Sequence, residues 1–133
     1  MSDRKTPYQD GIIIPLGVAA STEIEAGKMC ARNADGYAVP ASDTADLVVM
    51  GRSDEAVDNS SGGNGDKTVK VRRKKAFKFE NSATHAVTVA NIGEDVYVED
   101  AETVSTDGGD NSIVAGKCLG VDSADGQVWV EID

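Results

Sequence analysis

The residues that come nearest to a catalytic set are the hydroxyls of Ser82 and Thr84 and the imidazole of His85. A hydroxyl, a histidine base and a carboxylate are the parts of a hydrolytic site for acyl transfer. The chain has no G-x-S-x-G nucleophile elbow, however, and its one histidine lies in a polar stretch typical of a solvated turn. We therefore predict no catalytic residues and a protein that is not an enzyme. A small hydrolase that uses His85 is the weakest alternative.

Residues that could bind a metal are also few. The single histidine and the two distant cysteines do not complete a zinc site at any established spacing. Asp54, Asp58 and Asp66 surround a glycine-rich stretch that resembles a calcium loop, but the alternating ligands and final glutamate of an EF-hand are missing. We predict no metal site and no cofactor.

The segment 67–79 is strongly basic in an otherwise acidic chain, because it contains 7 of the 13 lysines and arginines in a protein of net charge -10. Its first residues alternate between apolar and basic, which predicts a strand. The run of like charges indicates either an edge strand that blocks unwanted pairing or a basic patch that binds an acidic partner surface. The candidate partner-binding residues in this run are Arg72, Arg73, Lys74 and Lys75.

Composition indicates one all-β domain. The 133 residues are enough for a single hydrophobic core, and 14 glycines with 5% aromatic residues favour short strands and tight turns. The acidic excess argues against a nucleic-acid binder, since contact with phosphates needs a basic face. The apolar run 12–14 ends at Pro15 and is too short for a signal peptide or membrane span, so we expect a product made in the cytoplasm that binds no membrane. Cys30 and Cys118 fit buried, reduced thiols.

Prolines and polar residues mark residues 1–21 as an extended N-terminal arm. Its short apolar strand is either an edge strand or a segment that lies on a partner. We expect a single all-β domain to follow over residues 22–133. The candidate contacts in the arm are Ile12, Ile13, Ile14, Pro15 and Leu16.

Residues 22–80 and 85–133 show the same order of strands and turns. This order predicts two similar three-strand units that close as a small barrel or sandwich, although convergent strand patterns could also produce it. The two final strands carry opposite charges, which suggests a head-to-tail contact between neighbouring copies as readily as docking on another surface. In this alignment Ala26-Gly27 matches Ile92-Gly93, Met50-Gly51 matches Leu119-Gly120, and 68–72 matches 127–131.

Three segments of the second half resemble small capsid decoration, or cement, proteins of tailed bacteriophages. They are IGEDVYV at 92–98, VAGKCLGV at 114–121 and GQVWVEI at 126–132, and they are similar to the family's G-x-x-V-Y, I-G-x-A and V-x-V strands. The loop 54–66 and the run 72–75 depart from the plainer members. The resemblance implies a non-catalytic virion protein on the capsid exterior, which binds the outer surface of a phage head, bridges major capsid protein subunits and self-associates as a homotrimer.

A β-module that binds carbohydrate or another small ligand is the alternative from a different class. Tyr37, Tyr97 and Trp129 would be its stacking platforms, with packing in the core as the plainer role for such residues. Aromatic side chains exposed on one face of a sheet would favour this alternative over a virion protein.

Overall fold

The computed structural model describes Arg4, Thr6 and residues 11–133, and almost all of its regular structure is β-strand. This confirms the predicted all-β class, and one of the sheets is a closed barrel. The elements are β1 (Ile13–Gly17), β2 (Thr22–Ile24), β3 (Met29–Arg32), β4 (Ala38–Pro40), β5 (Val48–Ser53), β6 (Val57–Asn59), β7 (Thr68–Arg72), β8 (Lys75–Asn81), the 3-10 helix η1 (Val89–Asn91), β9 (Asp95–Asp100), β10 (Thr103–Ser105), β11 (Val114–Val121) and β12 (Val128–Ile132).

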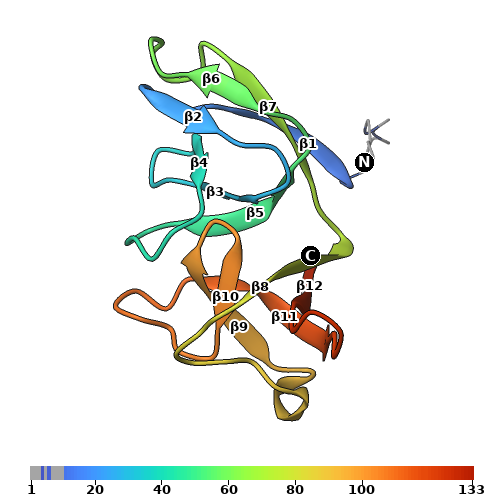
Figure 1. Cartoon of the computed structure of the whole chain (residues 1–133). Coiled ribbons are helices and arrows are strands. Elements are labelled where there is room, and N and C mark those ends of the chain that lie inside the picture. The colour runs from blue at the N-terminus through green and yellow to red at the C-terminus, as the bar shows by residue number, and fades with distance from the viewer. Residues whose placement is uncertain (1–3, 5, 7–10) are drawn as a thin grey trace.

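The first unit is a curled five-strand sheet with the order β1-β7-β5-β3-β4 (Figure 1). Its neighbouring strands are antiparallel, and one parallel bridge between Val18 and Ala38 brings the two ends of the sheet together. Strands β2 and β6 pair separately beside it. The core of this unit consists of Val18, Ile24, Cys30, Ala38, Val69 and Val71.

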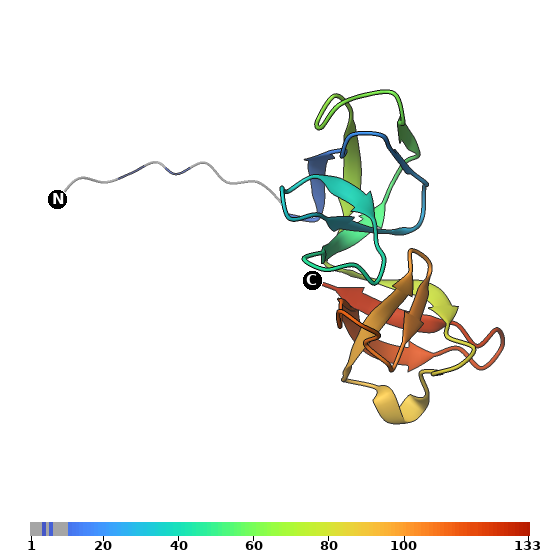
Figure 2. The same ribbon diagram turned by 90° about the vertical axis from the view of Figure 1, so that its left-hand side faces the viewer.

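The second unit is a closed barrel with the order β10-β8-β12-β11-β9. Its strands pair antiparallel except β10 and β8, which run parallel and close the barrel. Val96, Val98, Val128 and Val130 are buried at alternate positions of β9 and β12, as a period of two requires. Two views at right angles show the first unit stacked on the second (Figures 1 and 2).

The two units have the same topology. Strands β1, β3, β4, β5 and β7 correspond to β8, β9, β10, β11 and β12, with the same neighbours and the same directions. Single hydrogen bonds repeat too: the N–H of Gly27 donates to the carbonyl of Ser53 at 2.9 Å, and the N–H of Gly93 to that of Cys118 at 2.8 Å. The repeat therefore extends to individual backbone contacts.

The boundaries of the repeat differ from the sequence prediction. The units span 13–72 and 75–132, not 22–80 and 85–133, and each has five corresponding strands instead of three. The segment 67–79 is two strands in different units, because the chain turns at Lys74, whose φ is 61°. Residues 13–17 form the edge strand β1, which is the first of the two alternatives given for the apolar segment, and the domain therefore begins before residue 22. Residues 1–3, 5 and 7–10 of that arm lie outside the described residues.

One of the three matched pairs in the sequence alignment is wrong. Gly51 lies opposite Cys30, and Gly116 lies opposite Val96 at the corresponding place in the barrel. Gly51 therefore corresponds to Gly116 and not to Gly120. An apolar residue followed by glycine occurs at both places on β11, and only cross-strand pairing distinguishes them. The other two pairs are confirmed by the hydrogen bonds and the strand pairing.

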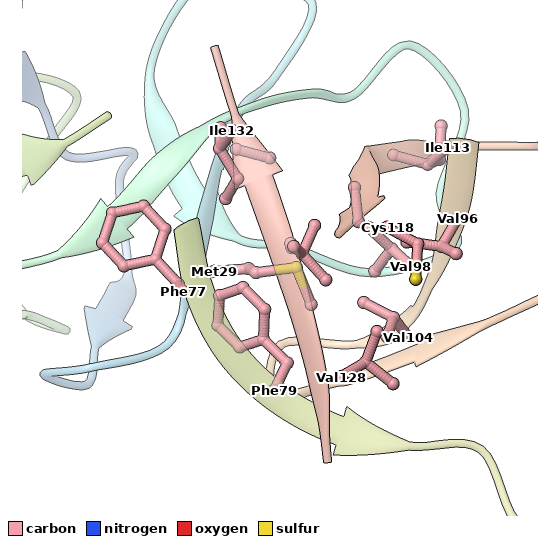
Figure 3. Close-up of a cluster of buried hydrophobic side chains, with 14 of the residues drawn as sticks. Met29, Phe77, Phe79, Val96, Val98, Val104, Ile113, Cys118, Val128 and Ile132 are labelled. Carbon is pink, nitrogen blue, oxygen red and sulfur yellow. The ribbon is translucent and has the colours of Figure 1, made fainter. Parts of the chain in front are cut away.

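The hydrophobic core of the barrel continues into the first unit. Met29, Ala41 and Leu47 belong to the first unit but are buried in one cluster with Phe77, Phe79 and the valines of the barrel. Figure 3 shows Met29 beside the two phenylalanines. Burial of a side chain of this size contributes about 1.5–3 kcal/mol. The barrel core therefore crosses the junction between the units, beside the separate core of the first unit.

Both cysteines are buried and free, as predicted. Cys30 lies in the core of the first unit, where burial raises the pKa of its thiol to about 12. Cys118 lies in the core of the barrel. Since the thiolate is the reactive form, Cys30 remains protonated and unreactive at neutral pH.

Candidate partner-binding surface

The two segments predicted to contact a partner lie side by side in the structure. Strand β1 pairs with β7, so Ile13 faces Arg72 across the ladder. One residue further along, the N–H of Arg73 donates to the carbonyl oxygen of Ile12 at 2.7 Å. The apolar residues and the basic run therefore meet at one end of the first unit. We call this surface the β1–β7 end, and it consists of Ile12, Ile13, Arg73, Lys74 and Lys75.

The five predicted contact residues of segment 12–16, four of which lie in β1, divide between core and solvent. Ile14 and Leu16 are half-buried and pack against the core of the first unit. Ile12 and Ile13 are 38% and 40% exposed, and Pro15 is also exposed. Ile12 and Ile13 are consequently the large apolar side chains of this segment that remain accessible to a partner.

Prolines protect both free edges of the first sheet. The carbonyl of Ile12 and the N–H of Val18 form hydrogen bonds on the β7 side of this segment, and the even-numbered residues between them point the same way. The odd-numbered residues point to the other side, so the nitrogen of Pro15 lies on the side of β1 away from β7. On β4, Ala38 and Pro40 direct their backbone groups away from β3, and the carbonyl of Ala38 there accepts the N–H of Ala19 at 3.0 Å, so Pro40 marks the part of this edge beyond the bridge. A proline has no N–H to donate, so a further strand cannot form a continuous ladder there. The surface therefore offers side chains to a partner and not a strand edge.

Arg72 forms an ion pair inside the first unit. Its guanidinium donates to both carboxylate oxygens of Asp54 at 3.0–3.2 Å, and Arg52 donates to the same carboxylate at 2.9 Å. The hydrogen bonds from Arg72 and then from Arg52 hold the pKa of Asp54 below its usual value. Arg72 therefore links strand β7 to the loop after β5, and its guanidinium is paired with a carboxylate of the same chain.

The remaining basic residues form the connection between the units. The N–H of Lys74 donates to the carbonyl of Ile132 at 2.6 Å, and Lys75 lies opposite Ile132 in the ladder of β8 and β12. Lys74 and Lys75 are exposed, whereas Arg73 is half-buried and its Nε has no hydrogen-bond partner among the described residues. The acidic final strand, which the sequence placed opposite the basic run in a neighbouring copy, already lies beside Lys75 in the same chain.

Charge is divided unequally between the two units. Residues 74–133 contain 12 acidic and 4 basic side chains, whereas residues 11–73 contain 9 and 7. Because like charges repel, an acidic protein surface is repelled most by the barrel and least by the first unit. The β1–β7 end is therefore the electrostatically favoured place for an acidic partner.

The side chains of Ser82 and His85, considered above for hydrolysis, belong to one hydrogen-bonded turn. The Ser82 hydroxyl donates to the Glu99 carboxylate at 2.6 Å and accepts the N–H of His85 at 3.1 Å. The His85 ring lies 3.3 Å from the Thr84 hydroxyl and 3.4 Å from the Asp107 carboxylate. In the described part of the chain, no hydrogen bond joins the Ser82 hydroxyl to this ring. Ser82 is thus not coupled to the imidazole as a nucleophile in acyl transfer would be, and of the two hydroxyls it is Thr84 that lies next to the ring.

The three aromatic residues considered as a carbohydrate platform do not share a surface. Tyr37 precedes β4 in the first unit, whereas Tyr97 and Trp129 lie on β9 and β12 of the barrel. Strand β11 separates these two strands. Trp129 is 41% exposed, and the Nζ atom of Lys78 lies 5.7 Å from the centre of its ring.

One polar contact between the units had no signal in the sequence. The carboxylate of Asp43 accepts the backbone N–H groups of Asp110 and Asn111, each at 2.9 Å. These bonds lower the pKa of Asp43 and tie a loop of the first unit to a loop of the barrel. The bonded residues are 67 and 68 positions apart, and each loop by itself has the composition of an exposed turn. The sequence of neither loop therefore indicates that it contacts the other.

No helix among the described residues is long and apolar enough to cross a membrane. Within that same part of the chain, no group of three or more histidines, cysteines and carboxylates is arranged to hold a metal ion. Comparison with family models, with curated proteins and with solved structures found no match for the chain.

Proposed function

We propose that this protein is a non-catalytic virion protein that binds the outer surface of a phage head and stabilises it by bridging major capsid protein subunits. It would act on the capsid exterior as a homotrimer. The observation that supports this most is the meeting of β1 and β7, which gathers exposed isoleucines and lysines at one end of an otherwise acidic molecule. The resemblance of segments 92–98, 114–121 and 126–132 to capsid decoration proteins supports it as well.

The mechanism would be additive. Ile12 and Ile13 would bury apolar surface, while Lys74 and Lys75 would match acidic groups on the shell. Each contact is modest, but linked copies convert later contacts into intramolecular ones and raise the overall affinity. Binding would therefore bridge capsid subunits without requiring one large interface.

Co-sedimentation with expanded, undecorated heads tests the proposal. The variant Lys74→Glu/Lys75→Glu should reduce binding at least several-fold at physiological salt. Arg72 is left intact, because its reversal would break the ion pair with Asp54. Lys67→Glu/Lys70→Glu is the control, since it makes the same charge change at exposed positions of the same region, away from the β1–β7 end. Failure of the unaltered protein to co-sediment over a range of salt would overturn the proposal.

A β-module that binds carbohydrate is the second candidate, and the exposure of Trp129 favours it. An exposed indole on a sheet can stack on the apolar face of a sugar ring. Screening against a panel of glycans tests this candidate. Binding that is lost in Trp129→Ala would support it over the virion proposal, and a panel without hits would remove it.

A further inference from the structure

The repeat places four residues of each unit at equivalent positions on the outside of its sheet. In the first unit, Met29 pairs with Arg52 and Ala31 with Val49. In the barrel, Asp95 pairs with Lys117 and Tyr97 with Val114, across the corresponding strands. We call these sets the first-unit face (Met29, Ala31, Val49 and Arg52) and the second-unit face (Asp95, Tyr97, Val114 and Lys117).

The first-unit face is covered by the barrel. Met29 and Ala31 are buried in the barrel core, and Val49 packs against it. The N–H of Met29 donates to the carbonyl of Ala101 at 2.7 Å, and the guanidinium of Arg52 lies 5.0 Å from the centre of the Phe77 ring. This face is therefore the surface through which one unit of the repeat docks on the next.

The second-unit face has no unit docked on it within the chain. Val114 is 41% exposed, Tyr97 is half-buried, and Asp95 and Lys117 are exposed. A groove of about 610 Å³ lies on one side of this face and includes the exposed Val48 of the first unit. A second groove of about 470 Å³ lies beside Tyr97. An apolar centre with charged neighbours and hollows on both sides is typical of a protein interface.

We propose that the second-unit face is bound by the first unit of a second copy, so that the contact between units within one chain is repeated between chains. The inference concerns the self-association included in the proposed function, but it rests on the repeat and not on binding to a shell. The contact is heterologous: one copy contributes its barrel and the next copy its first unit. Such contacts form a ring if the rotation closes, and a ring of three chains would be the homotrimer.

The repeat also identifies the part of the second copy that docks. Phe77 and Ile132 form the end of the barrel next to the first unit, and by strand pairing they correspond to Ile14 and to Arg73. The corresponding surface of the second copy is therefore the part of its first unit around Ile14 and Arg73, at the β1–β7 end. Charge favours this choice, because that end is basic whereas Asp95 and its neighbour Glu94 belong to the acidic barrel. A copy whose β1–β7 end lies against a neighbour cannot use that end on a shell, so in a closed ring this contact and the shell contact compete for one surface.

Light scattering of the purified protein over a concentration series tests the inference without any phage component. The unaltered protein should form oligomers, and Tyr97→Asp/Val114→Asp should be monomeric. Leu119→Asp/Trp129→Asp is the matched control, since it adds the same charge and removes exposed apolar side chains from the same barrel outside the face. It should associate like the unaltered protein. Circular dichroism would confirm that each variant is folded, and Val114→Asp alone serves if the double variant is not.

A mixing experiment distinguishes this heterologous contact from a symmetric one. The face variant Tyr97→Asp/Val114→Asp keeps an intact β1–β7 end, and the end variant Ile12→Asp/Ile13→Asp keeps an intact second-unit face. Each should be monomeric alone, and an equimolar mixture should form a dimer of one copy each. A mixture that stays monomeric, or unaltered protein that is monomeric at all concentrations, would overturn the inference. Unaltered protein that is monomeric and still co-sediments with heads would overturn the inference while leaving shell binding in place.

Discussion

Gly51 and Gly116 occupy the same position in the two units, and each lies against the backbone of the neighbouring strand. A Cβ atom on Gly51 would collide with the carbonyl oxygen of Arg72, and a Cβ atom on Gly116 would collide with that of Glu131. Glycine is needed at both places because the strands approach so closely that no side chain fits. The two units thus share a steric requirement in addition to their topology.

Replacement of either glycine by alanine should destabilise the protein by a similar amount. We expect Gly51→Ala and Gly116→Ala each to lower the free energy of unfolding by roughly 2–4 kcal/mol, since the backbone must shift to admit a methyl group. Chemical denaturation measures this. Gly120→Ala is the control, because the nearest atom to a Cβ there is 4.0 Å away. A larger loss in Gly120→Ala than in Gly116→Ala would contradict the correspondence of Gly51 with Gly116.

The ion pair of Asp54 should make stability depend on pH. The folded pKa of Asp54 is lowered, first by the hydrogen bond from Arg72, below the unfolded value of about 3.9. Its stabilisation is therefore present above the unfolded pKa and is lost as pH falls through the folded pKa. We expect Asp54→Asn to cost about 1 kcal/mol at neutral pH. Denaturation of both proteins should show this difference shrinking below about pH 4, and a difference constant with pH would refute the assignment.

Met29 should be the residue whose loss most weakens the junction of the units. Met29→Ala would leave a cavity between the first unit and the barrel, and we expect a loss of about 2–5 kcal/mol in the free energy of unfolding. Val48→Ala on β5 is the control, because Val48 is exposed and should change stability by less than about 1 kcal/mol. Equal effects of the two substitutions in thermal or chemical unfolding would show that the junction is not a packed core.

Both cysteines should become reactive in one step during unfolding. Cys30 and Cys118 lie in different units and in different hydrophobic clusters, but the cluster of Cys118 extends into the first unit, so the two units should open together. Labelling with a thiol reagent at increasing denaturant, followed by mass spectrometry, should give one common midpoint that coincides with loss of β-structure. Labelling of Cys30 at a clearly lower denaturant concentration would show instead that the first unit unfolds by itself.

Much of the fold was predictable from local patterns, but its division into units was not. Alternation around Val96 and Val128 predicts strands with valine inward, and the structure buries these residues. The alternation in segment 67–79 predicts one strand, yet a turn at Lys74 sends its two halves into different sheets. Apolar and charged residues continue the pattern on both sides of this turn. A period of two therefore cannot reveal that the partner strand changes there.

The candidate surface shows the same limit. The sequence identified the segment 12–16 and the run 72–75 as residues able to contact a partner, the first as part of a proline-punctuated arm and the second from its charge. It did not indicate that these segments are neighbours. It also did not indicate that Arg72 forms an ion pair with Asp54, whereas Lys74 and Lys75 stay exposed. Both facts depend on which strands pair. The paired residues of β1 and β7 are about 60 positions apart, and the sequence around each of them does not indicate its partner.

By itself the sequence indicated the all-β class, the buried cysteines and the acidic character, because these follow from composition and from short-range alternation. It suggested a repeat, but convergent strand patterns remained an alternative. The tertiary structure alone decided where the repeat begins and ends, that Gly51 corresponds to Gly116, and that the face of the first unit around Met29 docks on the barrel. The physical reason is that pairing and docking depend on competition among distant partners, which is resolved only when the strands close around their shared core.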